Sequence, residues 1–549
     1  MAKRNLVTSV LALCSLSIGL AGCSPTESPR ELTAFQSQVI GWGKCDNELL
    51  IDEDSQSKTF KSAQIDCASI LVPATYFGTD EVPNFKIQMM RLHKASESDF
   101  MGTIFINPGG PGGSGIEQVQ ASAFPAELTK HFDFIGFDPR GVGHSTFEDG
   151  TEIRCPDLLD YKTYFEVEGS PANELEYRDN VEIYDNYMES CAAENPLWWT
   201  MSTENVVNDL ELMRQLVTPN EDLNFIGTSY GTTIAGMYVT RYPEYVGKIV
   251  LDSPTTVDDD AISSVLEKAK AQESRLNKYL KGYAKHARMT ESEAWQALLA
   301  VRSYADNDLL VGYAGFETIE GKYLKSSEGL LIRGIQALQY MPEDRAVNEF
   351  NLAMDELLKH GWNAPFEWYA FSLDGYDPDS LAGDSLSKKK LKRSNSYEVM
   401  MIVNSMDYAS PELSEDKQRE LYAKFEEVAP RWTELNQDSS GYHYVGPTLG
   451  LSWTRLAQDN PNIPDPPTSP LKRTNESGKE LLIIGSTRES VTPFSFAKDT
   501  AKLLGSPLVS VQSATHGPAA GYDIKCLNEV LIDFFVKNKD VDDQSCPGK

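Results

Sequence analysis

The sequence predicts an α/β fold, with a mostly parallel β-sheet flanked by helices and a large helical insertion. Short apolar runs alternate with helical segments, as expected for strands that are buried on both faces of a sheet. These runs lie at 103–106, 132–137, 223–226, 246–251, 481–484 and 506–512. Two earlier segments, 69–76 and 84–93, are dense or alternating in apolar residues and are predicted to be antiparallel strands.

The strand rhythm stops in the middle of the chain, so we divide the mature protein into three parts. The first α/β segment covers 36–257, a helical cap covers 258–475 and a second α/β segment covers 476–549. Helical periods in the cap lie at 262–304, 328–341, 346–359 and 412–428, and Thr290 with Glu293 has the capping-box spacing of a helix start. The aromatic stretch 362–376 is interpreted as cap core, with a substrate pocket as the alternative.

Composition and charge exclude some functions. The 549 residues carry a formal net charge of −31, which argues against a nucleic-acid partner, because such proteins present basic faces. The hydrophobic content of 41% suits a globular protein with a large core. One basic run, 388–393, is interpreted as an exposed loop.

The N-terminus has the layout of a signal peptide over 1–22. Lys3 and Arg4 precede an apolar stretch, 6–20, which is short for a membrane span. This stretch ends in LAGC, which resembles the bacterial lipoprotein box and implies lipidation of Cys23. The resemblance further implies a tether over 23–35 and a lipid anchor in the cell envelope, at the outer membrane because Ser24 follows the cysteine. The alternative is an ordinary signal peptide that is cleaved near Ala21.

Six cysteines remain after the signal peptide and the lipidated residue are set aside: Cys45, Cys67, Cys155, Cys191, Cys526 and Cys546. An even number in an exported protein indicates disulfide bonds. Neighbour pairing, 45–67, 155–191 and 526–546, is the simplest of the connectivities. A metal site is the alternative, but the spacings contain no C-x-x-C.

The residues 227–231, GTSYG, form a G-x-S-x-G motif directly after an apolar run and before a helical one. Strand, motif and helix in this order are the context of a nucleophile elbow, in which a strained serine stands above the sheet. A chance match among 38 glycines is the alternative. We predict Ser229 as the catalytic nucleophile.

A second motif, NPGGPGGSG at 107–115, follows the strand at 103–106. Its glycines allow the backbone to approach a ligand closely. We predict an oxyanion hole from the Gly109–Gly110 region and the amide of Tyr230, the residue after the nucleophile. A phosphate loop is disfavoured because Gly-Lys-Ser/Thr is absent, and a linker would not directly follow a core strand.

The segments INPGGPGGSG, FDFIGFDPRGVGHS, GTSYG, GSTRESVTP and THG together resemble the α/β-hydrolase peptidases of the prolyl and tripeptidyl aminopeptidase branch (TAP-like). The resemblance covers 42–254 and 480–546, and the order of the motifs agrees throughout. It implies the α/β-hydrolase fold with a helical cap over the active site.

The base is predicted from chain order, which in this fold runs nucleophile, acid, histidine. Of seven histidines, His516 follows the last strand and fits this order, whereas His144 precedes the nucleophile. The relatives place the acid as Asp where this chain has Glu489, so Glu489 departs from the family pattern. Asp252, at the end of a strand, is the competing acid.

These residues predict acyl transfer: Ser229 attacks a carbonyl, His516 moves the proton and water hydrolyses the acyl-enzyme. No metal or organic cofactor is needed. The leading hypothesis is a lipid-anchored serine exopeptidase that removes residues or short peptides, tripeptides included, from free N-termini. Its partners would be peptides and, through the lipid, the membrane. The alternatives are an esterase or lipase-like hydrolase with the same triad, and a non-catalytic envelope binding protein.

Overall fold

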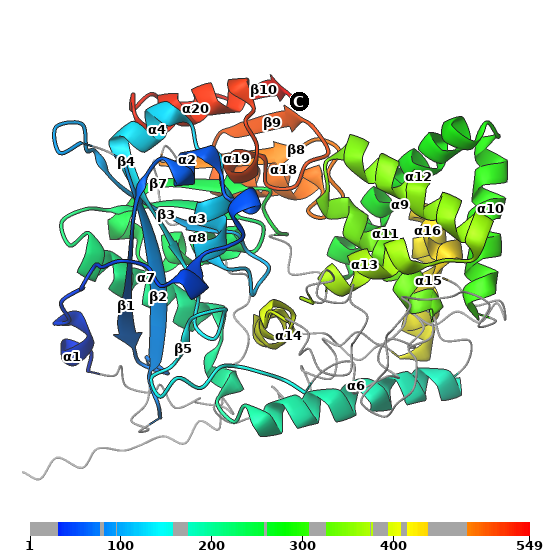
Figure 1. Ribbon diagram of the computed structural model, residues 1–549, viewed down its shortest axis with the longest axis horizontal. Helices are drawn as coiled ribbons and strands as arrows, with labels where there is room; N and C mark the ends of the chain where they lie inside the picture. The colour runs from blue at the N-terminus through cyan, green and yellow to red at the C-terminus, as the bar shows by residue number, and fades with distance from the viewer. Residues whose placement is uncertain are drawn as a thin grey trace, which may run out of the picture.

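The computed structural model describes residues 31–76, 82–94, 96–156, 174–256, 261–306, 326–373, 375–376, 393–407, 414–436 and 480–548. The predicted signal peptide, Cys23 and the lysines of the basic run lie outside these ranges. In Figure 1 the described chain forms a sheet with its covering helices, and a separate group of helices lies beside it.

A single sheet organises the α/β part. Its strands run in the order β1-β2-β4-β3-β6-β7-β8-β9-β10, with β5 paired to β2. β2 is antiparallel to β1, β4 and β5, and the remaining pairs are parallel. The strands are β1 Gln64–Val72, β2 Phe85–His93, β3 Gly102–Asn107, β4 Phe132–Phe137, β5 Thr146–Phe147, β6 Leu223–Thr228, β7 Val246–Asp252, β8 Leu481–Ser486, β9 Leu508–Gln512 and β10 Gln544–Pro547. The mostly parallel sheet predicted from the sequence is confirmed.

The first strand is displaced from its prediction. It covers Gln64–Val72 instead of 69–76, and it pairs with β2 along its whole length. The predicted C-terminal end of this strand was wrong because Pro73 has no amide hydrogen with which to continue the hydrogen bonds between strands.

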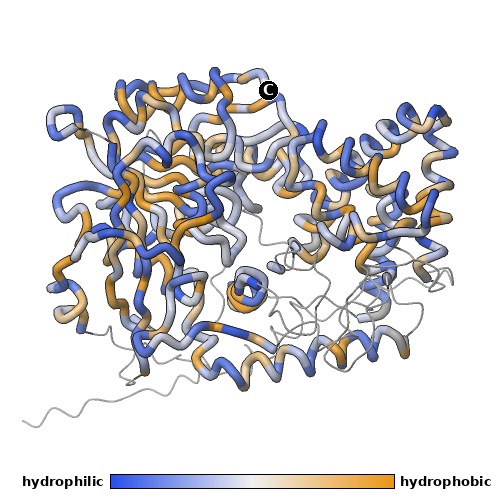
Figure 2. Tube along the Cα trace, in the orientation of Figure 1, coloured by the Kyte–Doolittle hydropathy of each residue, from blue (hydrophilic) through white to orange (hydrophobic). Residues whose placement is uncertain are grey.

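The two faces of the sheet bury different residues of the same strands. Ile104 and Ile106 pack with α3, α4 and α20, whereas Phe105 between them packs with α7, α8 and α18. These helices are α3 Gly115–Ala121, α4 Ala126–His131, α7 Thr203–Val217, α8 Gly231–Arg241, α18 Phe494–Leu504 and α20 Lys525–Phe535. Figure 2 shows hydrophobic residues concentrated along the strands between these layers.

Helices fill the described part of the chain between β7 and β8. They are α9 Ala261–Ala287, α10 Glu291–Asp306, α11 Glu328–Ala337, α12 Glu343–His360, α13 Ala364–Leu373, α14 Ser396–Asp407, α15 Glu415–Val428 and α16 Pro430–Leu435, with a 3₁₀ turn η6 at Leu338–Tyr340. All except α14 contribute to a hydrophobic core of their own, separate from the sheet. The predicted period 262–304 is two helices, and Thr290 and Glu293 form the capping box that begins the second.

The stretch 362–376, which the sequence predicts to be cap core, divides between two buried clusters. Phe366, Tyr369 and Phe371 are buried, whereas Trp362 is 43% exposed. The first two pack in the cap cluster, and Phe371 packs in the cluster of the sheet. None of the helices in the described ranges is both long and apolar enough to cross a bilayer.

Helix α14 packs on the sheet domain. Val399, Ile402 and Met406 belong to the same buried cluster as α7 and α8. The side chain of Asn395, just before the helix, donates to the main-chain oxygens of Gly141 and Ile153 at 2.7 and 3.0 Å. Part of the inserted chain is therefore built into the α/β core.

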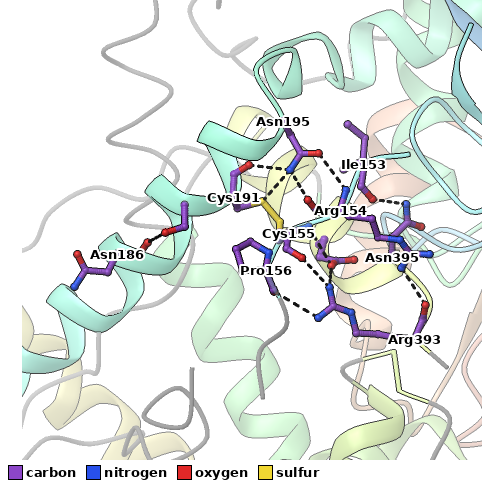
Figure 3. The surroundings of a disulfide bond; sticks show 11 residues. Ile153, Arg154, Cys155, Pro156, Asn186, Cys191, Asn195, Arg393 and Asn395 are labelled. Carbon is purple, nitrogen blue, oxygen red and sulfur yellow. Dashed lines mark hydrogen bonds and ion pairs between the residues drawn. A yellow bond between two sulfur atoms is a disulfide. The ribbon is translucent and has the colours of Figure 1, made fainter. Parts of the chain in front are cut away.

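The disulfides pair as neighbours, as predicted: Cys45–Cys67, Cys155–Cys191 and Cys526–Cys546. The second joins the segment after β5 to α6, Glu174–Glu194, and Figure 3 shows its surroundings. There Asn195 donates to the main-chain oxygen of Arg154 at 2.7 Å, and Arg393 donates to that of Cys155 at 3.1 Å. This disulfide thus lies where α6, the sheet domain and the start of α14 meet.

Candidate active site

Ser229 lies in the turn between β6 and α8, and its φ of 56° is in the left-handed region that residues with a side chain rarely adopt. The turn needs its glycines: a Cβ on Gly227 would lie 2.3 Å from the main-chain oxygen of Gly231. The amide of Ser229 donates to the main-chain oxygen of Asp252 at the end of β7, at 3.0 Å. The strand, tight turn and helix predicted around a partly exposed Ser229 are all present.

The glycine-rich loop after β3 lies directly on this turn. Gly109 has a φ of 88°, and a Cβ there would lie 2.4 Å from the main-chain oxygen of Thr228 and 2.7 Å from the amide nitrogen of Tyr230. The amide of Gly109 itself donates to Oδ1 of Asn107 at 2.9 Å. Of the two predicted glycines, Gly109 therefore provides the close approach, and Gly110 is the better candidate for an oxyanion donor.

Glu489 and His516 are joined by a hydrogen bond between Oε1 and Nδ1. The carboxylate is almost fully buried and accepts three further bonds, which hold it in place. Oε1 accepts from the amide and hydroxyl of Thr492 at 3.2 and 2.7 Å, and Oε2 accepts from the hydroxyl of Ser253 at 2.8 Å. The turn from Glu489 to Thr492 thereby accommodates a side chain one methylene longer than the aspartate that the family resemblance implies at this position.

Asp252, the competing acid, has a different contact. Its Oδ2 accepts from the amide of Ala519 at 2.8 Å and so holds the loop that follows His516. Burial works to lower the pKa of His516, but the charge and hydrogen bond of Glu489, with a contribution from the charge of Asp252, raise it above the ordinary value. The geometry therefore brings Glu489 to the imidazole and leaves Asp252 as a support of the loop.

The loop that carries His516 packs against the elbow. A Cβ on Gly517 would lie 2.6 Å from Cγ2 of Thr228, the residue before Ser229. The amide of Gly517 donates to the hydroxyl of Ser253 at 3.0 Å, so Ser253 joins this loop to Glu489. The His516 side chain is 14% exposed, so it does not face bulk solvent. Residues almost three hundred positions apart are thus gathered at one edge of the sheet.

The other described histidines have different surroundings. His93 contacts Asp133 at 2.6 Å at the end of β2, His286 contacts Asp355 at 3.1 Å in the cap, and His144 is exposed. Among the described residues, no group of three His, Cys, Asp or Glu side chains is arranged to hold a metal ion.

The residues that support the site are not among those that the sequence predicts as catalytic. Asn107 holds the glycine-rich loop and Ser253 holds Glu489. The available signal was a short polar residue at the end of an apolar run. Arg140, in the DPRG motif, is fully buried and pairs with Asp209 at 2.6 Å. Its guanidinium also donates to the main-chain oxygens of Ala74 and Thr200, so this motif ties the core together.

Comparison with protein families agrees with this geometry. Residues 102–287 match the family described as alpha/beta hydrolase fold, and residues 450–546 match the family described as TAP-like protein. The chain has the α/β-hydrolase fold with a TAP-like segment. The first match contains Ser229, and the second contains Glu489 and His516.

Three curated relatives share part of the hydrolase sequence. A tripeptidyl aminopeptidase of Streptomyces lividans is 31% identical over 36% of this chain and 37% of its own length. The serine protease Hip1 of Mycobacterium tuberculosis is 28% identical over 50% of this chain and 51% of its own. Carboxylesterase B of Mycobacterium tuberculosis is 27% identical over 39% and 41%, respectively. The chain thus spans about half, or less, of the length of each of these relatives.

Proposed function

We propose that this chain is a serine hydrolase that removes residues or short peptides from the free N-terminus of peptide substrates. The observation that carries the proposal is the hydrogen bond between Glu489 and His516, on a loop that packs against the strained turn of Ser229. A buried acid that orients an imidazole beside a serine elbow is the arrangement that activates a hydroxyl for acyl transfer.

Each residue has a defined part in the proposed reaction. His516 takes the proton of the Ser229 hydroxyl as that oxygen attacks the substrate carbonyl, and Glu489 stabilises the imidazolium that forms. The amides of Tyr230 and Gly110 receive the developing oxyanion. The tetrahedral intermediate collapses with loss of the amine, which takes its proton from His516. Water then attacks the acyl-enzyme by the same route and restores the free hydroxyl.

The names of two relatives, tripeptidyl aminopeptidase and serine protease, support a peptide substrate. The test uses alanyl-prolyl-alanyl and single-residue chromogenic amides, each with a free and with a blocked amino group. We expect turnover of the free forms only, and a loss of at least about 10³-fold in Ser229→Ala. Equal rates on free and blocked substrates would refute the aminopeptidase assignment while leaving a serine hydrolase.

A second candidate is an esterase, which the similarity to Carboxylesterase B favours. The same triad would then cleave esters, and fast ester turnover with undetectable amide turnover would identify it. A fluorophosphonate probe separates both enzymes from a binding protein on this fold. We expect it to label the wild type and to leave Ser229→Ala unlabelled.

We also propose that the protein is anchored in the cell envelope through a lipid on Cys23. The support is the LAGC sequence after a basic and apolar N-terminus. Metabolic labelling with a fatty acid should mark the wild type and spare Cys23→Ser. Labelling of both proteins, or of neither, would refute the anchor.

A further inference from the structure

The cap places an aromatic ring against the proposed catalytic histidine. Tyr340, the last residue of η6, has its ring centroid 6.0 Å from that of His516, at an interplanar angle of 89°. Tyr340 is 50% exposed, so much of its surface is available for contact with a bound molecule. We infer that Tyr340 forms a wall of the subsite for the leaving group, the part of the substrate that follows the cleaved bond.

The position of Tyr340 is held by an arginine buried in the cap. The guanidinium of Arg275, in α9, is 3% exposed and donates to the main-chain oxygen of Met341 at 2.9 Å. It also lies 3.6 Å from the carboxylate of Glu343, in the first turn of α12. Met341 and Glu343 both follow Tyr340, so one buried side chain holds the main chain directly after the ring.

A second contact ties the same turn to the acid loop. Glu343 also lies 3.6 Å from the guanidinium of Arg488, the residue before Glu489. Arg488 is in turn fixed through its amide, which donates to the main-chain oxygen of Ser513 at 2.9 Å. Burial and, after it, the charge of Glu489 raise the pKa of the Tyr340 phenol.

The mechanism assigns a side of the substrate to this ring. The acyl part must lie on the glycine-rich loop, which supplies the oxyanion donors. The leaving amine must reach the imidazole of His516, because that group protonates it. A ring against His516 therefore contacts the leaving group. The leaving group that fits the ring of Tyr340 is an amine whose first residue carries a large apolar or aromatic side chain.

This inference rests on the proposed function, and acyl-enzyme partitioning tests it. The acyl-enzyme is formed from an ester or amide donor. Phenylalaninamide or glycinamide is then added and competes with water for the acyl group. The amine nitrogen bonds to the acyl carbon as the bond to Oγ of Ser229 breaks. Its proton passes through His516 to that oxygen. We expect wild type to transfer preferentially to phenylalaninamide, and Tyr340→Ala to lose that preference by roughly fivefold.

Three comparisons isolate the ring. Tyr340→Phe should keep the preference, because it retains the ring and loses only the hydroxyl. Tyr304→Ala removes a tyrosine of similar exposure (47%) from α10 and should behave as wild type. In Figure 1 helix α10 lies at the outer side of the cap. Partitioning to glycinamide relative to water should change less than about twofold in every variant.

Two results would overturn the inference alone: an unchanged preference in Tyr340→Ala, or an equal loss for both amines, which would mean that His516 itself had moved. Failure of the wild type to form an acyl-enzyme from any donor would instead overturn the proposed function, and the inference with it.

Discussion

Glu489 and His516 share a hydrogen bond although they belong to two different loops, one after β8 and one after β9. β8 and β9 are parallel neighbours, so their carboxyl ends meet at the same edge of the sheet. The negative charge of Glu489 is the main influence that raises the pKa of His516, against the effect of burial. This pair therefore controls both the orientation and the protonation of the imidazole.

Replacing the acid should change the rate and its pH dependence. We expect Glu489→Gln to lower kcat by about 10³–10⁴-fold, because the amide no longer stabilises the imidazolium. Catalysis needs a neutral His516, so kcat/KM falls as the pH drops through its pKa. Removing the charge of Glu489 lowers the pKa of His516. In Glu489→Gln the decrease in kcat/KM should therefore occur at lower pH than in wild type. The pH profile of kcat/KM for wild type and variant measures both effects.

Asp252→Asn is the matched control for this prediction. Its side-chain oxygen still accepts the amide of Ala519, so we expect a loss of less than about tenfold. If Asp252→Asn abolished activity and Glu489→Gln did not, the acid would be Asp252.

Ser253 should matter to catalysis although it is not part of the triad. Its hydroxyl donates to Glu489 and accepts from the amide of Gly517, so Ser253→Ala removes a bond to a charged group. We expect kcat to fall roughly tenfold while KM changes little. Ser253 has a φ of 53°, which a glycine adopts more readily than an alanine. Ser253→Gly removes the same hydroxyl without adding backbone strain, so it should show the same loss in kcat. A wild-type kcat in Ser253→Gly would mean that strain, and not the lost hydrogen bond, causes the loss in Ser253→Ala.

Close packing of Gly109 on the elbow predicts that it tolerates no side chain. A Cβ there would approach main-chain atoms of Thr228 and Tyr230 to 2.4 and 2.7 Å, and these cannot move without disturbing Ser229. We expect Gly109→Ala to lower kcat/KM by about 10²–10³-fold, the loss seen when an oxyanion donor is misplaced.

Gly150 provides a control with the same backbone angle. Its φ is also 88°, but nothing lies within 4 Å of the position of its Cβ. Gly150→Ala should lower the melting temperature slightly through backbone strain and leave kcat/KM within about twofold. Equal losses of kcat/KM in the two variants would show that the collision at Gly109 is not the cause.

The sequence predicts local features of this site better than distant ones. The turn at Ser229 could be predicted because its glycines meet the steric demands of a single local turn. The strands could be predicted because they coincide with apolar runs. The disulfides could be paired because neighbouring cysteines were the simplest choice. The contacts of Tyr340 with His516 and of α14 with the sheet depend on how the insertion folds back, which helical periodicity does not encode. Such contacts require coordinates.

The same insertion also predicts a pH dependence of stability. Asp407, at the end of α14, accepts from the amide and hydroxyl of Thr203, and that hydroxyl also contacts the phenol of Tyr230. Burial, opposed by the bonds from Thr203, raises the pKa of Asp407 to about 7. An acid whose folded pKa lies above its unfolded value binds more protons when folded, so the free energy of unfolding decreases as pH rises between about 4 and about 7.

Asp407→Asn removes this titration. The melting temperature of the variant should therefore rise relative to wild type as pH increases through that interval, and the difference should be constant above it. Asp149→Asn should show the opposite sign at lower pH. Asp149 accepts from the amide of Thr151 at 2.9 Å, and its bonds to Thr151 lower its pKa, so its contribution to stability is lost on acidification. A melting-temperature difference between Asp407→Asn and wild type that does not vary with pH would contradict the prediction.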